Sequence, residues 1–197
     1  MSLKAGSKAP DFEVKNQHGE IVSLKSLKGK KVVLYFYPRD MTPGCTAEAC
    51  NLRDNYQVLI KQAYVVLGVS TDDEKSHLKF IAKEKLPFQL LADIDKKLHL
   101  LYGTWVEKSM YGRKYMGTAR VTFIINETGI IEQVISDVDT KNHTAQILNQ
   151  PSIQPKKPVK KAAEKPAKKV AAKAIKKTAK KKIIKTGKKS GSSKKKK

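Results

Sequence analysis

The sequence has only two cysteines, Cys45 and Cys50, and it lacks any long hydrophobic run. Without an apolar stretch of about 18 residues it contains no candidate membrane-spanning helix. The N-terminal residues 1–6 also lack the apolar core of a signal peptide. Two cysteines in a reducing cytosol fit redox chemistry better than a permanent disulfide. We therefore expect a cytoplasmic protein that makes no membrane contact.

Aromatic and acidic residues are nearly missing from the last quarter of the chain. No Phe, Tyr or Trp follows Phe123, and residues 151–197 contain twenty lysines against one acidic residue, Glu164. Residues 1–150 are close to charge balance, with 21 basic and 17 acidic residues. Dense like charge with few apolar groups cannot offset the entropy of ordering a chain. We predict one domain over residues 1–150 and a disordered basic tail over residues 151–197.

The composition of this tail predicts binding to nucleic-acid backbones. Lysines contact phosphates without reading bases, and the missing aromatics remove stacking on single strands. The tail is similar to the Lys/Ala/Pro tails of linker histones, and the resemblance implies non-specific nucleic-acid binding through the tail lysines, with association to the nucleoid. A solubilising segment, or a segment that binds other polyanions such as acidic lipids, is the open alternative.

Apolar strands and helical stretches alternate within residues 1–150. Continuous apolar runs at 32–37 and 64–69 are followed by helical patterns at about 43–61 and 74–85, which is typical of parallel strands covered on both faces. The sequence therefore predicts a mixed sheet flanked by helices. Smaller expected elements are a strand pair at 11–14 and 21–24, a helical turn at 26–30, an extended piece at 86–91, a brief helix at about 93–101, a hairpin at 120–125 and 130–135, and a final helix at about 140–149.

Within residues 1–150, residues 102–118 form the longest stretch without a clear helix or strand pattern. The stretch is polar and aromatic, and it contains Trp105 and three glycines. A loop of this length in a compact domain tends to be functional. We expect either a functional loop or a flap that covers the edge of the sheet.

The chemistry-bearing segment follows the first buried strand. Pro38 stops the strand, and Thr42 and Pro43 are typical of a helix start, with Thr42 at the N-cap position. Cys45 is then the third helical residue, among backbone N–H groups that have no partner within the helix. Such a position favours the thiolate, which is the nucleophilic form of cysteine. The Thr42 hydroxyl would be within reach of the sulfur or of an oxygen bound to it.

Cys50 lies five residues beyond Cys45, and this spacing restricts how the two can pair. Ideal helix geometry separates their Cα atoms by about 8.6 Å, whereas a disulfide needs roughly 4.4–6.8 Å. Pairing would therefore require the first turns of the helix to unwind. Two other interpretations are that both cysteines are small core residues, or that they bind zinc. The zinc interpretation lacks a second pair of ligands, because the four histidines are scattered without ligand spacing.

The stretch from Tyr37 to Thr46, Tyr-Pro-Arg-Asp-Met-Thr-Pro-Gly-Cys-Thr, resembles the active-site motif of peroxiredoxins. The added Cys50 is similar to the bacterioferritin-comigratory-protein (PrxQ) subgroup. The likeness covers residues 5 to about 149 and includes the run from Arg120 to Phe123. It implies a thioredoxin-like fold and a thiol peroxidase with these roles: Cys45 as the peroxidatic cysteine, Cys50 as the resolving cysteine, Thr42 as a partner of the peroxide oxygen, Arg120 as the activating guanidinium and Pro38 as a shield of the sulfur.

The same resemblance implies a reaction sequence. Hydrogen peroxide or an organic hydroperoxide would convert Cys45 to a sulfenic acid, and an intramolecular disulfide between Cys45 and Cys50 would follow. Thioredoxin or a similar dithiol would reduce that disulfide. No metal or organic cofactor is needed, and we expect a monomer.

Two further expectations concern arginines, and two other functions stay open. Arg120 could project to the same end of the sheet as Cys45, whereas Arg53 is expected to be an ordinary salt-bridged or solvated helix charge.

One alternative function is a histone-like nucleic-acid-binding protein whose redox domain is secondary or inactive. The other is a thioredoxin-like disulfide reductase, against which Cys-x4-Cys in place of Cys-x-x-Cys argues.

Overall fold

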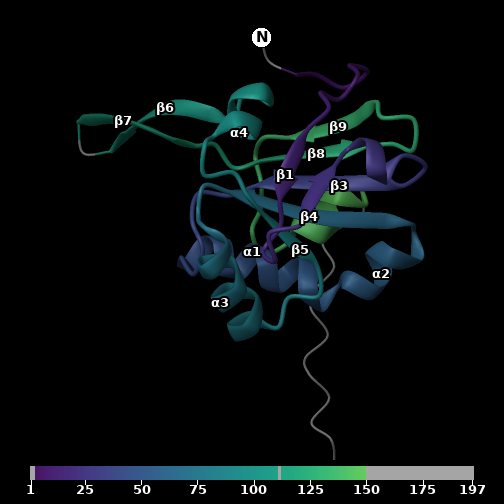
Figure 1. Cartoon of the computed structure of the whole chain (residues 1–197), viewed down its shortest axis with the longest axis horizontal. Coiled ribbons are helices and arrows are strands. Elements are labelled where there is room, and N and C mark those ends of the chain that lie inside the picture. Colours follow the sequence, from purple (N-terminus) through teal and green to yellow (C-terminus); the bar gives the residue numbers. More distant parts are fainter. Residues whose placement is uncertain (1–2, 111, 150–197) are drawn as a thin grey trace, which may run out of the picture. The chain divides into compact units, whose positions relative to one another are not determined.

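A five-stranded sheet in the order β5-β4-β3-β8-β9 forms the centre of the fold (Figure 1). The computed structural model describes residues 3–110 and 112–149, so the predicted disordered tail lies outside the described residues. The predicted boundary between residues 150 and 151 stays a prediction. Strand β3 (Lys31–Phe36) pairs in parallel with β4 (Tyr64–Ser70), and β4 pairs in parallel with β5 (Gln89–Ala92). Strand β8 (Val121–Ile125) is antiparallel to both β3 and β9 (Ile131–Ile135). The predicted mixed sheet and its C-terminal hairpin are confirmed.

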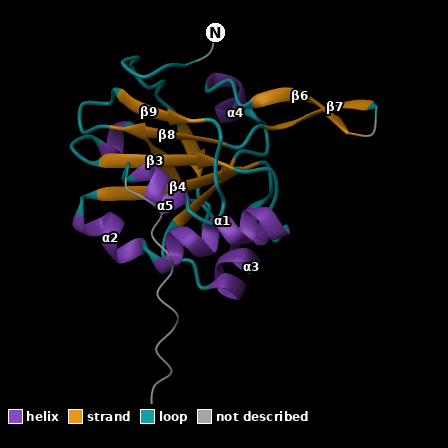
Figure 2. Cartoon of the chain, turned by 180° about the vertical axis from the view of Figure 1, so that it is seen from behind, coloured by secondary structure: helices purple, strands orange, loops and turns teal. Residues whose placement is uncertain are grey.

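The alternation of side chains along β3 supplies both cores of the domain. Val33 and Tyr35 are buried on one face of the sheet, and Val32 and Leu34 are buried on the other. A strand buried on both faces needs an unbroken apolar run, as the sequence of β3 shows. The first face is covered by four helices, α1 (Pro43–Asp54), α2 (Tyr56–Lys61), α3 (Glu74–Glu84) and α5 (His143–Ile147). Figure 2 shows α1, α2 and α3 together on that side.

The second face is covered by elements from two parts of the chain. They are the antiparallel pair β1 (Glu13–Lys15) and β2 (Ile21–Ser23), the short helix η1 (Lys25–Leu27) and α4 (Lys97–Leu101). The side chain of Asn16 holds the β1–β2 turn by accepting the backbone N–H groups of His18 and Glu20 at 2.9 and 3.0 Å. His18 is therefore a turn residue. None of the helices in the described part of the chain is long and apolar enough to cross a membrane.

The single helix predicted over residues 43–61 is wrong, because the structure divides it at Asn55. This residue has φ −107° and ψ 10°, and it separates α1 from α2. Its side-chain amide donates to the carbonyl of Asn51 at 2.8 Å. Asparagine competes with the backbone for hydrogen bonds in this way, so the helix is interrupted although the apolar pattern continues.

The long loop predicted over residues 102–118 is also wrong. The structure forms an antiparallel hairpin there, β6 (Trp105–Met110) and β7 (Arg113–Thr118). The hairpin extends away from the sheet in Figures 1 and 2 and does not lie over its edge. Most of β7 is exposed. A ribbon without a buried face does not need alternating apolar residues, which explains why the period-two signal is missing.

Candidate active site

Cys45 lies in the first turn of α1, beyond the carboxyl end of β3. The helix begins at Pro43 with Thr42 at its N-cap, so Cys45 is the third helical residue, as predicted. Its side chain is only 2% exposed and belongs to the core cluster that includes Tyr35 and Tyr37. Burial alone would fit an inert core cysteine. Its sulfur also contacts a guanidinium, a contact that an inert core cysteine does not need.

A guanidinium connects the sulfur to a buried carboxyl group. Arg120, immediately before β8, donates Nη2–H to Cys45 Sγ at 3.3 Å. Its Nη1 donates to Glu48 Oε2. Glu48 is fully buried and follows Cys45 by three residues on α1. The structure therefore brings Arg120 and Cys45 together at one end of the sheet, where a guanidinium can stabilise a thiolate.

His143 of α5 lies behind the Glu48 carboxyl group. Its Nδ1 is 3.2 Å from Glu48 Oε1 without hydrogen-bond geometry, and its Nε2 is 2.9 Å from Thr122 Oγ1. Burial raises the pKa of Glu48 to about 7 although Arg120 opposes the rise. Burial, together with the Arg120 charge, lowers the pKa of His143 to about 3. Near neutral pH the cluster thus holds a permanent cation, a neutral imidazole and a carboxyl group that titrates.

Thr42 and Pro38 flank the loop that leads to Cys45. The Thr42 hydroxyl donates to the Arg39 carbonyl at 3.1 Å and makes no capping hydrogen bond. Thr42 therefore occupies the N-cap position without capping the helix through its side chain. Pro38 is half-buried just after β3. The roles of Thr42 toward a peroxide oxygen and of Pro38 as a shield stay predictions.

A buried carboxylate anchors this loop to α3. Asp40 accepts hydrogen bonds from Tyr37 OH and Ser76 Oγ, both at 2.7 Å, and its Oδ2 lies 2.9 Å from His77 Nδ1. Its backbone N–H donates to Asp72 Oδ2 at 2.9 Å. Burial would raise the pKa of Asp40, but the hydrogen bonds, led by that with His77, hold it below its usual value. The loop before Cys45 is thus fixed from several sides.

Cys50 lies on the part of α1 that contacts α3. Its Sγ is 3.6 Å from Glu84 Oε2, and the side chain is partly exposed. Both cysteines are free thiols within one continuous helix, so a bond between them requires that helix to unwind. Arg53 forms an ion pair with Asp54 at 2.8 Å, as expected for a salt-bridged helix charge, and its Nη1 also donates to the Glu84 carbonyl.

Sequence reasoning missed Glu48, His143 and Lys108. Glu48 could have been found, because residues three apart on a helix share a face. His143 reaches the site from a distant part of the chain, and no local pattern indicates it. Lys108 of β6 donates to the Thr118 carbonyl. Burial, with the Arg120 charge adding to it, lowers the pKa of Lys108.

Across residues 3–110 and 112–149, no three His, Cys, Asp or Glu side chains come together as metal ligands.

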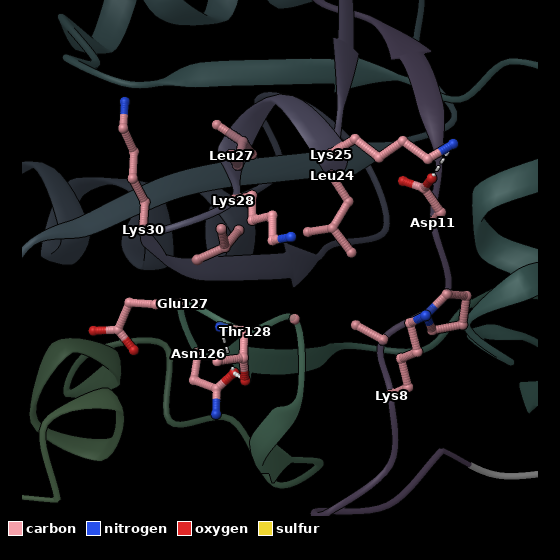
Figure 3. A pocket seen from close by; sticks show the side chains of 14 residues that line it. Lys8, Asp11, Leu24, Lys25, Leu27, Lys28, Lys30, Asn126, Glu127 and Thr128 are labelled. Atoms are coloured by element: carbon pink, nitrogen blue, oxygen red, sulfur yellow. Dashed lines mark hydrogen bonds and ion pairs between the residues drawn. The ribbon is translucent and has the colours of Figure 1, made fainter.

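A separate hollow of about 460 Å³ is lined by Lys30 and Val32 at the start of β3, whereas Cys45 lies beyond the end of that strand. Figure 3 shows the side chains that line this hollow. It is formed by the segment before β1, the η1 region and the β8–β9 turn. Four lysines line it, and one of them, Lys25, pairs with Asp11 at 2.8 Å. None of the predicted site residues contributes to this hollow.

Comparison with known proteins points to one family. The chain matches the model of the AhpC/TSA family over residues 5–134. It is 45% identical to peroxiredoxin Bcp of Bacillus subtilis over 148 residues, covering 75% of this chain and 94% of the relative. It is 46% identical to peroxiredoxin Bcp of Escherichia coli over 147 residues, with the same two coverages.

Solved structures agree with these relatives. A mutant of Xylella fastidiosa PrxQ matches with a TM-score of 0.71 and 29% identity, covering 76% of this chain and 95% of that one. A Xanthomonas campestris bacterioferritin comigratory protein, studied for its alkyl peroxide reduction activity, matches with a TM-score of 0.67 and 33% identity, covering 70% and 88%. These matches confirm the thioredoxin-like arrangement of a mixed sheet with flanking helices.

Proposed function

Because this chain belongs to the AhpC/TSA family and is a thiol peroxidase of the Bcp (PrxQ) type, we propose that Cys45 is the thiol that reacts with hydroperoxides. The observation that carries the assignment is the contact of the Arg120 guanidinium with Cys45 Sγ in the first turn of α1. Organic hydroperoxides and hydrogen peroxide are the proposed substrates. The relative described for alkyl peroxide reduction supports the first of these.

In the first step the Cys45 thiolate attacks the O–O bond of the hydroperoxide. A sulfur–oxygen bond forms as the O–O bond breaks, which gives a Cys45 sulfenic acid and, after protonation, an alcohol or water. Arg120 stabilises the thiolate and, together with the Thr42 hydroxyl, the negative charge on the leaving oxygen. No cofactor takes part, because the sulfur supplies both electrons.

In the second step the first turns of α1 unwind and Cys50 attacks the sulfenic sulfur. A disulfide between Cys45 and Cys50 forms, and the sulfenic oxygen leaves as water with the proton of the Cys50 thiol. Thioredoxin or a similar dithiol then reduces the disulfide by thiol–disulfide exchange. The cytoplasm is the proposed compartment, since its reducing systems supply such dithiols.

Cysteine variants test this division of roles. Cys45→Ser should abolish hydroperoxide consumption, whereas Cys50→Ser should still be oxidised once and then stop. Mass spectrometry after one equivalent of peroxide should locate a Cys45–Cys50 link in the wild type. Hydroperoxide-dependent oxidation of thioredoxin separates this enzyme from a plain disulfide reductase. Loss of the first oxidation in Cys50→Ser alone would contradict the assignment.

For residues 151–197 we propose a second, independent role in non-specific nucleic-acid binding. The support is compositional, namely twenty lysines, one acid and no aromatic residue. Gel shifts at graded salt should show retention by the full chain and little by a 1–150 fragment. The affinity should fall with a log–log slope of roughly −0.9 per phosphate neutralised. Equal retention of both proteins would contradict the proposal. Peroxidase assays of the 1–150 fragment would show whether the redox domain is active without the tail.

A further inference from the structure

Glu84, the last residue of α3, contacts α1 through both its side chain and its backbone. Its Oε2 lies 3.6 Å from Cys50 Sγ, in position to accept the S–H hydrogen bond. Its carbonyl accepts Arg53 Nη1–H at 2.6 Å. Two neighbouring turns of α1 are thus held by one residue of α3.

The part of α1 that follows Cys50 is fixed on a second side. Asn51 Nδ2 donates to the Lys141 carbonyl at 2.6 Å, and Asn51 Oδ1 accepts Thr144 N–H and Thr144 Oγ1–H at 2.8 and 2.9 Å. Asn51 is buried, so these bonds are shielded from water. Unwinding of α1 should therefore involve the residues up to Cys50 and stop at Asn51. The contact of Cys50 with Glu84 stands at that junction.

We propose that Glu84 is a positioning residue that holds the resolving thiol of Cys50 against α3 and thereby sets how long the Cys45 sulfenic acid survives. The inference rests on the function proposed above. While Cys50 stays docked, a second hydroperoxide can oxidise the sulfenic acid to a sulfinic acid and itself become an alcohol. Once Cys50 is released, the disulfide and water form instead. The two outcomes compete, and Glu84 biases the competition.

The electrostatic surroundings of Cys50 also disfavour its attack on the sulfenic sulfur, as its docking against α3 does. Partial burial raises the pKa of the Cys50 thiol, and the nearby Glu84 carboxylate adds to the rise, while Arg53 opposes it. The attacking species in disulfide formation is the thiolate. A docked Cys50 is therefore both out of reach of Cys45 and held in its unreactive form.

The variant Glu84→Gln tests the proposal, because it removes the carboxylate charge and leaves the backbone carbonyl for Arg53. The exposed Glu132→Gln on β9 is the matched control. Glutamine keeps an acceptor oxygen but loses the negative charge, which weakens the S–H hydrogen bond and lets the Cys50 thiol ionise more readily, so a rate change of about two- to fivefold is expected. We expect disulfide formation, followed by quenching, alkylation and mass spectrometry, to become faster by that factor. The peroxide dose that gives half sulfinic acid should rise similarly, and the first oxidation of Cys45 should not change.

A second measurement needs no peroxide chemistry and separates the two proposals. In a Cys45→Ser background, Glu84→Gln should speed the reaction of Cys50 with a disulfide reagent such as DTNB by the same factor. In a Cys50→Ser background, the reaction of Cys45 with DTNB should be unchanged, which excludes general loosening of the fold. Faster labelling without peroxide-dependent oxidation of Cys45 would refute the enzyme assignment alone. Cys50 labelling or disulfide formation at or below the parent rate would overturn the role of Glu84.

Discussion

Replacing Glu48 by glutamine should change how the stability of the protein depends on pH. Burial raises the pKa of Glu48 from its ordinary value of 4.5 to about 7. Between these values the folded protein keeps a proton that the unfolded chain has released. The contribution of this group to the free energy of unfolding is therefore complete below pH 4.5 and is lost as the pH rises toward 7.

His143 contributes with the opposite sign. Burial lowers its pKa from 6.5 to about 3, so the unfolded chain binds the proton first on acidification. Its contribution is complete above pH 6.5 and is lost as the pH falls toward 3. Between pH 4.5 and 6.5, folding takes up about one proton at Glu48 and releases about one at His143. In the wild type the two contributions to the pH dependence of stability therefore nearly cancel.

Glu48→Gln removes the contribution of Glu48 to the pH dependence and leaves that of His143. Each pH unit corresponds to about 1.4 kcal/mol for one proton, so the free energy of unfolding of the variant should gain about 3 kcal/mol relative to wild type between pH 4.5 and 6.5. Urea unfolding followed by circular dichroism at several pH values measures this difference, whatever constant offset the substitution adds. Glu132→Gln, on an exposed strand position, should run parallel to wild type. A Glu48→Gln profile that also runs parallel would refute the reasoning.

Three further substitutions probe the site and the core. Arg120→Met removes the donor to Cys45 and should slow the single oxidation of a Cys50→Ser protein about ten- to a hundredfold in stopped-flow assays; less than a twofold change would speak against it. Thr42→Val should slow the same step about tenfold while leaving the melting temperature nearly unchanged, because the hydroxyl does not cap α1. Gly68→Ala should cost about 1–3 kcal/mol in urea unfolding, since a Cβ there would lie 2.6 Å from both Leu90 Cδ2 and the Tyr35 hydroxyl. An unchanged unfolding midpoint would show that this contact relaxes freely.

The centre of the fold could be predicted from the sequence because its signals are local. The apolar runs that became β3 and β4 are buried on both faces, and the Thr42-Pro43 pair marks the start of α1. The hairpin of β6 and β7 was missed because a ribbon exposed on both sides carries no alternating pattern. The break at Asn55 was missed because it depends on a side-chain hydrogen bond to Asn51.

The site was predictable only in part, for a similar reason. Cys45 was singled out by its place at a predicted helix start, Arg120 by the motif resemblance, and Glu48 follows from helical spacing once Cys45 is chosen. His143 and Glu84 come from other helices, and their placement depends on how α5 and α3 pack against α1. That packing depends on the whole core, which no short stretch of sequence encodes.

The anchoring of Asp40 has a consequence for recovery between turnovers. Its bonds to Tyr37, Ser76 and His77 lie before the segment of α1 that must melt, and the bonds of Asn51 lie after it. The segment that must melt, residues 43–50, is thus about two helical turns long, and both of its ends stay anchored to the folded domain. After reduction of the disulfide, both ends of the segment are still held by the folded domain. Recovery therefore requires only that this short segment re-form its helix, while the rest of the domain stays folded.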